Sequence, residues 1–292
     1  MRGSVGFEKF PRTLKGEGHL YSDKDICLHL IGKRRCSIII PSFEVLECLK
    51  AAVLAIETYT DRDNYELIIV DNNSSKDVQD YLLSLQDQGR AVVVLNESNT
   101  GYSFAVNQGI QLAEKDSDLI LFNNDAIVTS GWLNALYEAK DLNPNAGLIM
   151  PSQILPGGSG SQKSHVPFCD KGYEVDVNLS FHHQNIGQVK TVNGNKQFVN
   201  ITFAAFFCVM ITRDCFNQLG LLDHVNGRHY KSDRLYCKLA RKEGVEIIYT
   251  PYAKVYHLLQ QATKALKKSD KEQYDVMFVK NKWDSSIPKL SK

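Results

Sequence analysis

Short apolar runs with the composition of β-strands alternate four times with amphipathic helical segments between residues 36 and 140. The strand-like runs are 36–40, 65–70, 91–95 and 118–122, and the helical segments are 44–59, 77–89, 103–115 and 131–140. In such chains each helix carries the backbone to the start of the next strand, so the strands lie parallel in one sheet. The alternation therefore predicts an α/β fold whose sheet is covered by helices on both faces.

The alternation becomes irregular after residue 155. An apolar run at 198–212 predicts a long central strand, and two helical segments and a further short strand follow it, at 213–220, 233–244 and 245–250. We therefore expect a mixed sheet that spans two halves of one domain. The predicted boundaries are an N-terminal extension (1–35), a domain at 36–257 with halves at 36–150 and 151–257, and a C-terminal helical tail (258–292).

The charge and composition argue against several classes of protein. A net charge of +1 gives no overall field that would attract nucleic acid, and no apolar run approaches the roughly 20 residues of a membrane-spanning helix. Seven scattered cysteines without a CxxC pair favour free thiols in a reducing compartment, so we expect a cytoplasmic protein. The tail holds eight lysines and four acidic residues, which would also allow peripheral contact with an anionic membrane at its inner face.

Polar side chains follow each of the four early strands. Because the carboxyl ends of parallel strands meet at one edge of a sheet, these residues predict a ligand site rich in hydrogen-bonding groups there. No GxxxxGK[ST] or GxGxxG motif is present, so a glycine-rich loop is not expected to hold phosphates. A Mg²⁺ or Mn²⁺ ion, held by one or two carboxylates and by the phosphates themselves, is the expected substitute.

Five segments resemble the family 2 glycosyltransferases, which have the GT-A nucleotide-sugar fold. They are "SIIIPSFE", "LIIVDNNSSKD", "NTGYSFAVNQGI", "LFNNDAIVTSGWL" and "YKSDRLYCKLARKEGVEIIYTPYAKVYH", and together they cover about residues 36–257. The resemblance implies a Rossmann-like mixed sheet flanked by helices. It also implies metal-dependent, inverting transfer of a sugar from a UDP- or dTDP-sugar to a hydroxyl of a glycan or lipid-linked glycan, such as a bacterial surface polysaccharide.

The resemblance assigns a metal site to two residues. Asp125 ends "NND", which resembles the family's DxD-type motif, and its implied role is to bind a divalent ion that bridges the two phosphates of the donor. His257 in "KVYH" resembles a late histidine that completes the metal or diphosphate site. The alternatives are a turn aspartate and a histidine whose hydrogen bonds are satisfied at a strand end. Asn123, in place of the motif's first acid, is expected to contact the ribose or the sugar.

The same resemblance places the nucleotide at the ends of the first two strands. Asp71 and Asn72 resemble the residues that read the base and ribose, although "DNNSS" would also suit an Asx turn. The first loop, with Pro41, Ser42, Phe43 and Glu44, is expected to hold the base partly through its backbone. Glu44 could equally be an acid that stabilises a helix N-terminus.

Four further residues complete the expected nucleotide-sugar site. Asn99, Gly101 and Asn107 belong to an "N-x-G…N-x-G" signature, in which a glycine would allow close approach of backbone to ligand. Asn107 could instead satisfy its hydrogen bonds within the core. Asn124 is assigned to the same site through its place in "NND".

Asp233 resembles the aspartate that serves as the general base in this family. The pair reads Ser232-Asp233 here, so the usual preceding acid is missing, and Leu235 stands where a later acid is usual. Its position at a helix N-terminus predicts a lowered pKa, and Asp223 is the second candidate. A helix-capping role is the alternative for Asp233. An inactive GT-A domain that binds nucleotide-sugar or glycan within a larger assembly is the alternative for the chain.

Overall fold

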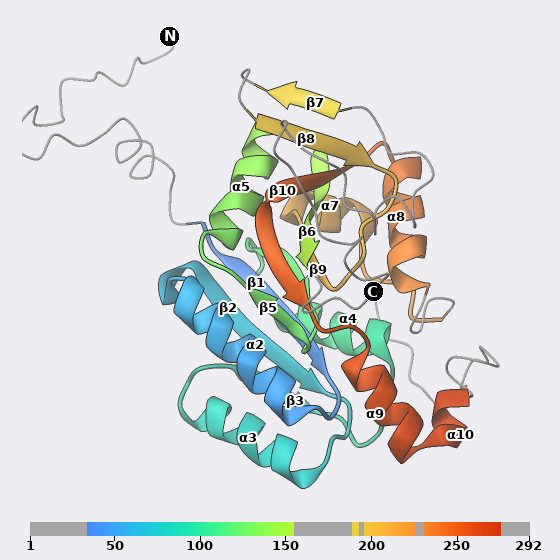
Figure 1. Ribbon diagram of the computed structural model, residues 1–292. Coiled ribbons are helices and arrows are strands. Elements are labelled where there is room, and N and C mark those ends of the chain that lie inside the picture. Colours follow the sequence, from blue (N-terminus) through green and yellow to red (C-terminus); the bar gives the residue numbers. More distant parts are fainter. Residues whose placement is uncertain (1–33, 155–188, 193–195, 226–230, 276–292) are drawn as a thin grey trace, which may run out of the picture. The chain divides into compact units, whose positions relative to one another are not determined.

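The computed structural model describes residues 34–154, 189–192, 196–225 and 231–275 (Figure 1). The expected N-terminal extension (1–35) therefore lies outside the described residues, apart from its last two. The loop and polar segment after residue 154 and the end of the tail from residue 276 also lie outside them, so the predictions made for these segments stay predictions.

The first half of the domain forms the expected alternation of strands and helices. The strands are β1 (Cys36–Ser42), β2 (Tyr65–Asp71), β3 (Val92–Leu95) and β4 (Asp118–Phe122), and the helices are α2 (Leu46–Tyr59), α3 (Lys76–Asp87) and α4 (Tyr102–Leu112), with a short 3₁₀ turn, η2 (Arg62–Asn64). β1 pairs in parallel with both β2 and β4, and β2 pairs in parallel with β3. The prediction of four parallel strands is therefore confirmed, and their carboxyl ends share one edge.

The second half extends the same sheet. Its elements are β5 (Ala126–Val128), α5 (Trp132–Leu142), β6 (Ala146–Ile154), β7 (Val189–Val192), β8 (Lys196–Ile201), β9 (Cys208–Ile211), α7 (Arg213–Leu219), α8 (Ser232–Lys242) and β10 (Glu246–His257). The strand order is β3-β2-β1-β4-β9-β6-β10-β8-β7, and β5 pairs with β10. β9 lies antiparallel between β4 and β6, so the sheet is mixed, as expected.

Helices cover both faces of the sheet (Figure 1). The indole N–H of Trp132, at the start of α5, donates to the hydroxyl of Thr60 at the end of α2 (2.9 Å), so these two helices share a face. Asn107 of α4 bonds the backbone of Leu222, just after α7, which places α4 and α7 together on a face. The core consists of buried apolar residues of the strands together with those of the helices that pack on them, such as Leu49 of α2.

The prediction of one long strand at 198–212 was wrong. The segment forms two strands, β8 and β9, with different neighbours: β8 pairs with β10, whereas β9 pairs with β4 and β6. The intervening residues turn towards the ends of β1 and β4, where the Phe206 carbonyl accepts the Tyr102 hydroxyl (2.9 Å) and the Phe207 carbonyl accepts the Asn123 N–H (2.8 Å). Because every residue from 203 to 209 is apolar, hydropathy alone does not mark the bend.

Two other boundaries differ from expectation. β10 runs on to His257 instead of ending at residue 250, and its pairing with β6 shifts register between Thr250 and Lys254, around Pro251. Up to residue 275, where the description of the tail ends, two short helices, α9 (Gln261–Ser269) and α10 (Lys271–Tyr274), are present in place of one. They separate at Asp270, whose carboxylate caps α10 by accepting the Gln273 N–H (2.8 Å).

Two further expectations concern thiols and membranes. Cys36, Cys48, Cys208, Cys215 and Cys237 are free thiols, as predicted, and burial raises the pKa of each. Within the described part of the chain, no helix has both the length and the apolar character to cross a bilayer.

Candidate active site at the carboxyl edge of the sheet

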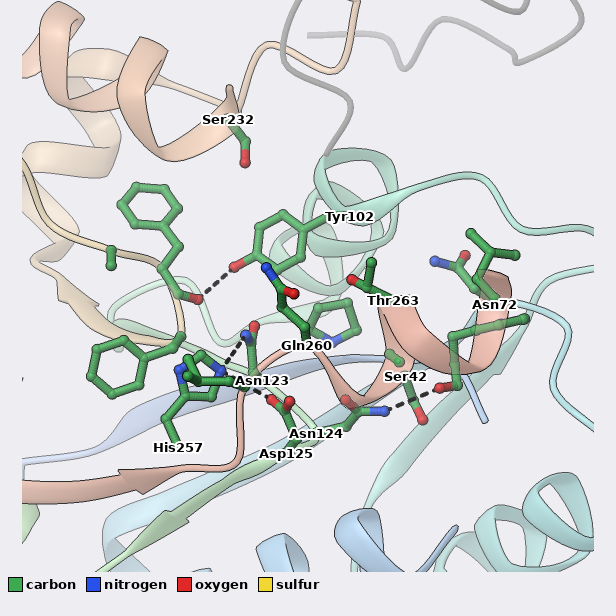
Figure 2. A pocket seen from close by; sticks show the side chains of 18 of the residues that line it. Ser42, Asn72, Tyr102, Asn123, Asn124, Asp125, Ser232, His257, Gln260 and Thr263 are labelled. Atoms are coloured by element: carbon green, nitrogen blue, oxygen red, sulfur yellow. Dashed lines mark hydrogen bonds and ion pairs between the residues drawn. The ribbon is translucent and has the colours of Figure 1, made fainter. Parts of the chain in front are cut away.

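A cavity of about 380 Å³ lies where β1, β4 and β10 end. The loops after β1 and β4 form one wall, and the start of α8, the Ala205–Phe207 segment and the first turns of α9 supply the others (Figure 2). Most of the residues predicted for the site line this cavity: Pro41, Ser42, Phe43, Asn72, Asn99, Asn123, Asn124, Asp125, Asp233 and His257. The structure thus gathers side chains that are more than 200 residues apart in the sequence.

Glu44, Gly101 and Asn107 do not line the cavity. The Glu44 carboxylate accepts the Ser75 N–H and hydroxyl (2.9 and 2.8 Å), which joins the loop after β1 to the start of α3. Asn107 is fully buried and bonds the Leu222 backbone in both directions, which matches its core alternative. Gly101 is the N-cap of α4 and has a φ of 91°. Glycine adopts this backbone conformation most readily, so the residue type is explained without a ligand contact.

Asp71 also lies outside the cavity lining. It is fully buried, and its two carboxylate oxygens accept the N–H and the hydroxyl of Ser74 (2.9 and 2.5 Å). Burial raises the pKa of this carboxyl, and the bonds from Ser74 oppose that rise. Asp71 thus bonds a residue three positions along the chain, a local turn role related to the Asx turn, and a direct contact between Asp71 and the base stays a prediction.

Asn72 is the residue of this loop that faces the cavity. Its Oδ1 accepts the Thr100 backbone N–H (3.4 Å) and hydroxyl (2.9 Å), and its Nδ2 donates to the Gly101 carbonyl (3.3 Å). Because a backbone N–H can only donate and a carbonyl can only accept, these contacts fix the orientation of the amide. Asn96 and Gln108 extend the network behind it. Among the described residues, the second Nδ2 hydrogen of Asn72 has no acceptor, so it can bond a ligand.

Asp125 and His257 form a pair on one wall of the cavity. Oδ1 of Asp125 lies 3.2 Å from Nε2 of His257, and Oδ2 accepts the backbone N–H of Gln261 (3.1 Å) at the start of α9. Burial alone would raise the pKa of the Asp125 carboxyl, but the hydrogen bonds from His257 and Gln261 and the attraction of His257 together lower it. Asp125 is therefore a carboxylate at neutral pH, although it is only 3% exposed.

His257 is held in place on two sides. Its ring stacks on Phe207 with centroids 5.0 Å apart, and its Nδ1 lies 2.9 Å from the amide nitrogen of Gln153. As the Gln153 amide is placed, its N–H donates to Nδ1, so Nε2 carries the hydrogen that bonds Asp125, and a metal ion bound at Nε2 would displace that hydrogen.

The donor set fits a divalent ion. One carboxylate oxygen and one imidazole nitrogen converge, and phosphate oxygens of a ligand could complete the coordination that Mn²⁺ or Mg²⁺ prefers. The described residues contain no cluster of three or more metal-ligating side chains. A metal here would therefore depend on the ligand as well as on the protein.

Asp233, in the first turn of α8, lines the same cavity. Burial raises its pKa to about 6, and the N–H of Arg234 (2.7 Å) only partly offsets that rise. The expectation of a lowered pKa was therefore wrong, because burial outweighs the stabilisation by the helix N-terminus. Asp223, the second candidate, is exposed, does not line the cavity and accepts the Val225 N–H (2.9 Å).

Several residues of the cavity were not among the predicted site residues. They are Tyr102, Gln153, Ala205, Phe206, Phe207, Ser232 and a group from the segment after β10: Leu259, Gln260, Ala262, Thr263 and Leu266. Tyr102 stands directly after "NTG", the one signal in the sequence that could have drawn attention to it. The α9 residues carry no motif, because their place depends on how the chain turns after β10.

The curled mixed sheet flanked by helices is the fold of GT-A glycosyltransferases. Residues 37–220 match the family described as "Glycosyl transferase family 2". This chain therefore belongs to glycosyl transferase family 2, whose general activity is glycosyl transfer.

Solved structures share this fold, and one curated relative is similar in sequence. A structure of GalNAc-T7 with UDP, GalNAc and Mn²⁺ has a TM-score of 0.59 at 19% identity. The match covers 78% of this chain and 44% of the GalNAc-T7 chain. Residues 1–349 of S. aureus TarS give a TM-score of 0.55 at 11% identity, and the match covers 85% of this chain and 73% of the TarS chain. Uncharacterized protein y4gI of Sinorhizobium fredii (strain NBRC 101917 / NGR234) is 26% identical over 223 residues, or 76% of this chain. The chain spans about a quarter of that relative's length (24%).

Proposed function

We propose that this chain transfers a sugar from a UDP- or dTDP-sugar to a hydroxyl group of a glycan or lipid-linked glycan, with inversion at the anomeric carbon. The observation that carries the proposal is the cavity itself. It combines carboxamides at the strand ends, a carboxylate–imidazole pair at Asp125 and His257, and a separate carboxylate at Asp233. A bacterial surface polysaccharide is the class of product we propose.

The donor side of the cavity suits a nucleoside diphosphate. Pro41, Ser42 and Phe43 offer backbone and a hydroxyl, and Asn72 offers one oriented N–H to an acceptor on the base or ribose. The described residues that line the cavity include no lysine or arginine. A diphosphate bound there would need a divalent ion to offset its charge, and the structure of GalNAc-T7 with UDP and Mn²⁺ supports this proposal by analogy.

In the proposed reaction, Asp125 and His257 would hold Mn²⁺ or Mg²⁺ against the donor's phosphates. The bound ion would stabilise the charge that develops on the leaving nucleoside diphosphate. Asp233 takes the proton of the acceptor hydroxyl while that oxygen forms a bond to the anomeric carbon. The bond from this carbon to the phosphate oxygen breaks, and its electron pair leaves with the nucleoside diphosphate. Attack opposite the leaving group inverts the carbon, and no second carboxylate is needed as a nucleophile.

A pH profile tests the role of Asp233. Because the base must be ionised, and because the pKa of Asp233 is raised to about 6, transfer should be constant above neutral pH and fall as the pH drops through about 6. Initial rates of transfer at saturating Mn²⁺ between pH 5 and pH 8 would measure this acidic limb, in buffers where the protein stays folded. A rate that stays level down to pH 5 would contradict the assignment.

Nucleotide preference tests the donor site independently of catalysis. With Mn²⁺ present, UDP or dTDP should raise the melting temperature more than GDP or ADP at equal concentration, because a purine is larger than the pyrimidine for which we propose the Pro41–Phe43 wall. Differential scanning fluorimetry measures the four shifts. Equal shifts for all four nucleotides would show that the pocket does not select the base.

We also propose a cytoplasmic location with peripheral membrane contact. The support is the set of exposed lysines on α9, namely Lys264, Lys267 and Lys268, within a tail that holds eight lysines and four acids. Such lysines are attracted to anionic lipid, which would suit an acceptor carried on a lipid.

A further inference from the structure

We propose that the first turn of α9 is the diphosphate-binding element of the cavity, with the backbone N–H groups of Ala262 and Thr263 and the Thr263 hydroxyl as its donors. This inference rests on the proposed use of a nucleoside diphosphate-sugar. It assigns to a helix without a recognisable motif the contact that lysine or arginine often makes with phosphates.

The position of α9 is the first support. β10 ends at His257, and the next residues turn the chain through two left-handed conformations, Leu259 (φ 59°) and Gln260 (φ 56°). The helix then starts at Gln261 with its first turns along the cavity, where Ala262, Thr263 and Leu266 belong to the lining. Figure 2 shows Gln260 and Thr263 among the side chains that surround the cavity with Ser42 and Asp125.

The hydrogen bonding of the helix N-terminus is the second support. The N–H groups in the first turn of a helix have no partner within the helix. The Gln261 N–H already donates to a carboxylate oxygen of Asp125 (3.1 Å), so this helix end meets an anionic oxygen within the site. Gln260 gives no side-chain cap, and within the described residues no acceptor is present for the N–H groups of Ala262 and Thr263.

Ser42 is an independent sign of a missing ligand. It stands at the end of β1 and lines the same cavity, and its side chain is 0% exposed. Its hydroxyl has no hydrogen-bond partner within the described residues. Buried hydroxyl groups in native structures are rarely left without a partner, so this hydroxyl supports a polar ligand in the cavity.

The electrostatics favour an anion at this place. The N-terminus of a helix carries about half a positive charge and binds phosphate through its free N–H groups. In the described part of the cavity lining, no side chain of lysine or arginine competes for this role. The outward face of α9 holds Lys264, Lys267 and Lys268, which are exposed and do not line the cavity.

The test replaces Thr263 by Glu and by Gln. Both side chains are similar in size, so the difference between the variants isolates a negative charge at the helix end. An acid in the first turn stabilises a helix, so Thr263→Glu should unfold at or above the wild-type temperature. Lys264→Gln is the matched control, because it changes the charge by the same one unit, one residue away, on the outward face.

Calorimetry with UDP and Mn²⁺ should show that Thr263→Glu binds about tenfold or more weakly than Thr263→Gln, while Lys264→Gln binds like wild type. Uridine, which lacks phosphate, should bind all the variants equally in a ligand-detected NMR titration. Equal UDP affinities of the Glu and Gln variants would overturn the role of α9. The same would follow if Thr263→Glu weakened the binding of uridine as much as the binding of UDP. If wild type binds neither UDP nor dTDP, the proposed function itself is overturned.

Discussion

Replacing Asp125 by alanine is expected to abolish the dependence of nucleotide binding on Mn²⁺. Asp125 is the only carboxylate within the "NND" segment, and in the described part of the cavity lining the one other carboxylate is Asp233. With Asp125 gone, His257 alone would face the diphosphate, and one imidazole does not hold Mn²⁺ or Mg²⁺. Isothermal titration of UDP, with Mn²⁺ and with EDTA, should give two different affinities for wild type and a single weak affinity for the variant.

Two further variants separate this effect from a loss of structure. Asp125 also accepts the Gln261 N–H, so alanine could loosen the start of α9. Asp125→Asn keeps an acceptor for that N–H and should still lose the dependence on Mn²⁺. Asp77→Ala removes an exposed acid from the first turn of α3, outside the cavity, and should bind like wild type. If Mn²⁺ strengthens UDP binding to Asp125→Asn as much as to wild type, Asp125 is not the metal ligand.

Asp233→Asn is expected to lower the rate of sugar transfer by about 10²-fold or more, the usual effect of removing a general base. Asparagine is nearly the same size as aspartate and cannot take up the acceptor's proton, so the fold should be retained. Binding of UDP with Mn²⁺ should stay within about twofold of wild type, because the proposed donor contacts lie across the cavity. A large loss of transfer rate with almost no loss of UDP affinity would show that Asp233 acts in the chemical step and not in donor binding.

Asp223→Asn provides the control for this experiment. Asp223 is exposed and does not line the cavity, so its amide variant should transfer at nearly the wild-type rate. An inactive Asp223→Asn beside a fully active Asp233→Asn would move the role of base to Asp223. Near-normal rates in both variants would mean that the base is elsewhere.

The periodicity of the sequence was enough to predict the donor half of the fold. β1, β2 and β4 are short buried strands separated by amphipathic helices, and both signals are local. A local signal could not predict the pairing of β9, which lies antiparallel between β4 and β6. Hydropathy did not reveal the bend before β9, because Phe206 and Phe207, which line the cavity, are as apolar as the core residues around them.

Several of the residues that line the cavity could be predicted because they stand at strand ends. Asn123 to Asp125 line the cavity because β4 ends there, and the same topology places Asn72. Asp71 and Asn107 illustrate the limit of this reasoning, because polar residues at a strand end or on a helix also satisfy turns and buried backbone. The pKa of Asp233 could not be foreseen, since it depends on how deeply the folded chain buries that carboxylate.

The missing acid before Asp233 leaves one specific alternative, a domain that binds nucleotide-sugar and does not turn it over. Ser232 occupies that position and lines the cavity. The carboxylate of Asp233 is present all the same, at a pKa close to the pH at which a base works best. Catalysis by one base therefore needs no acid at position 232, and this favours the enzyme over the inactive domain.

The most direct test of the proposed activity is turnover of the donor. Wild type, Asp125→Asn and Asp233→Asn would be incubated with Mn²⁺ and a panel of UDP- and dTDP-sugars without acceptor, so that water takes the place of the hydroxyl, and the released nucleoside diphosphate would be measured. We expect wild type to release UDP or dTDP from at least one donor, and both variants to release far less. Binding of a donor by wild type, without release of nucleotide from any member of the panel, would contradict the proposed catalysis and identify a binding domain.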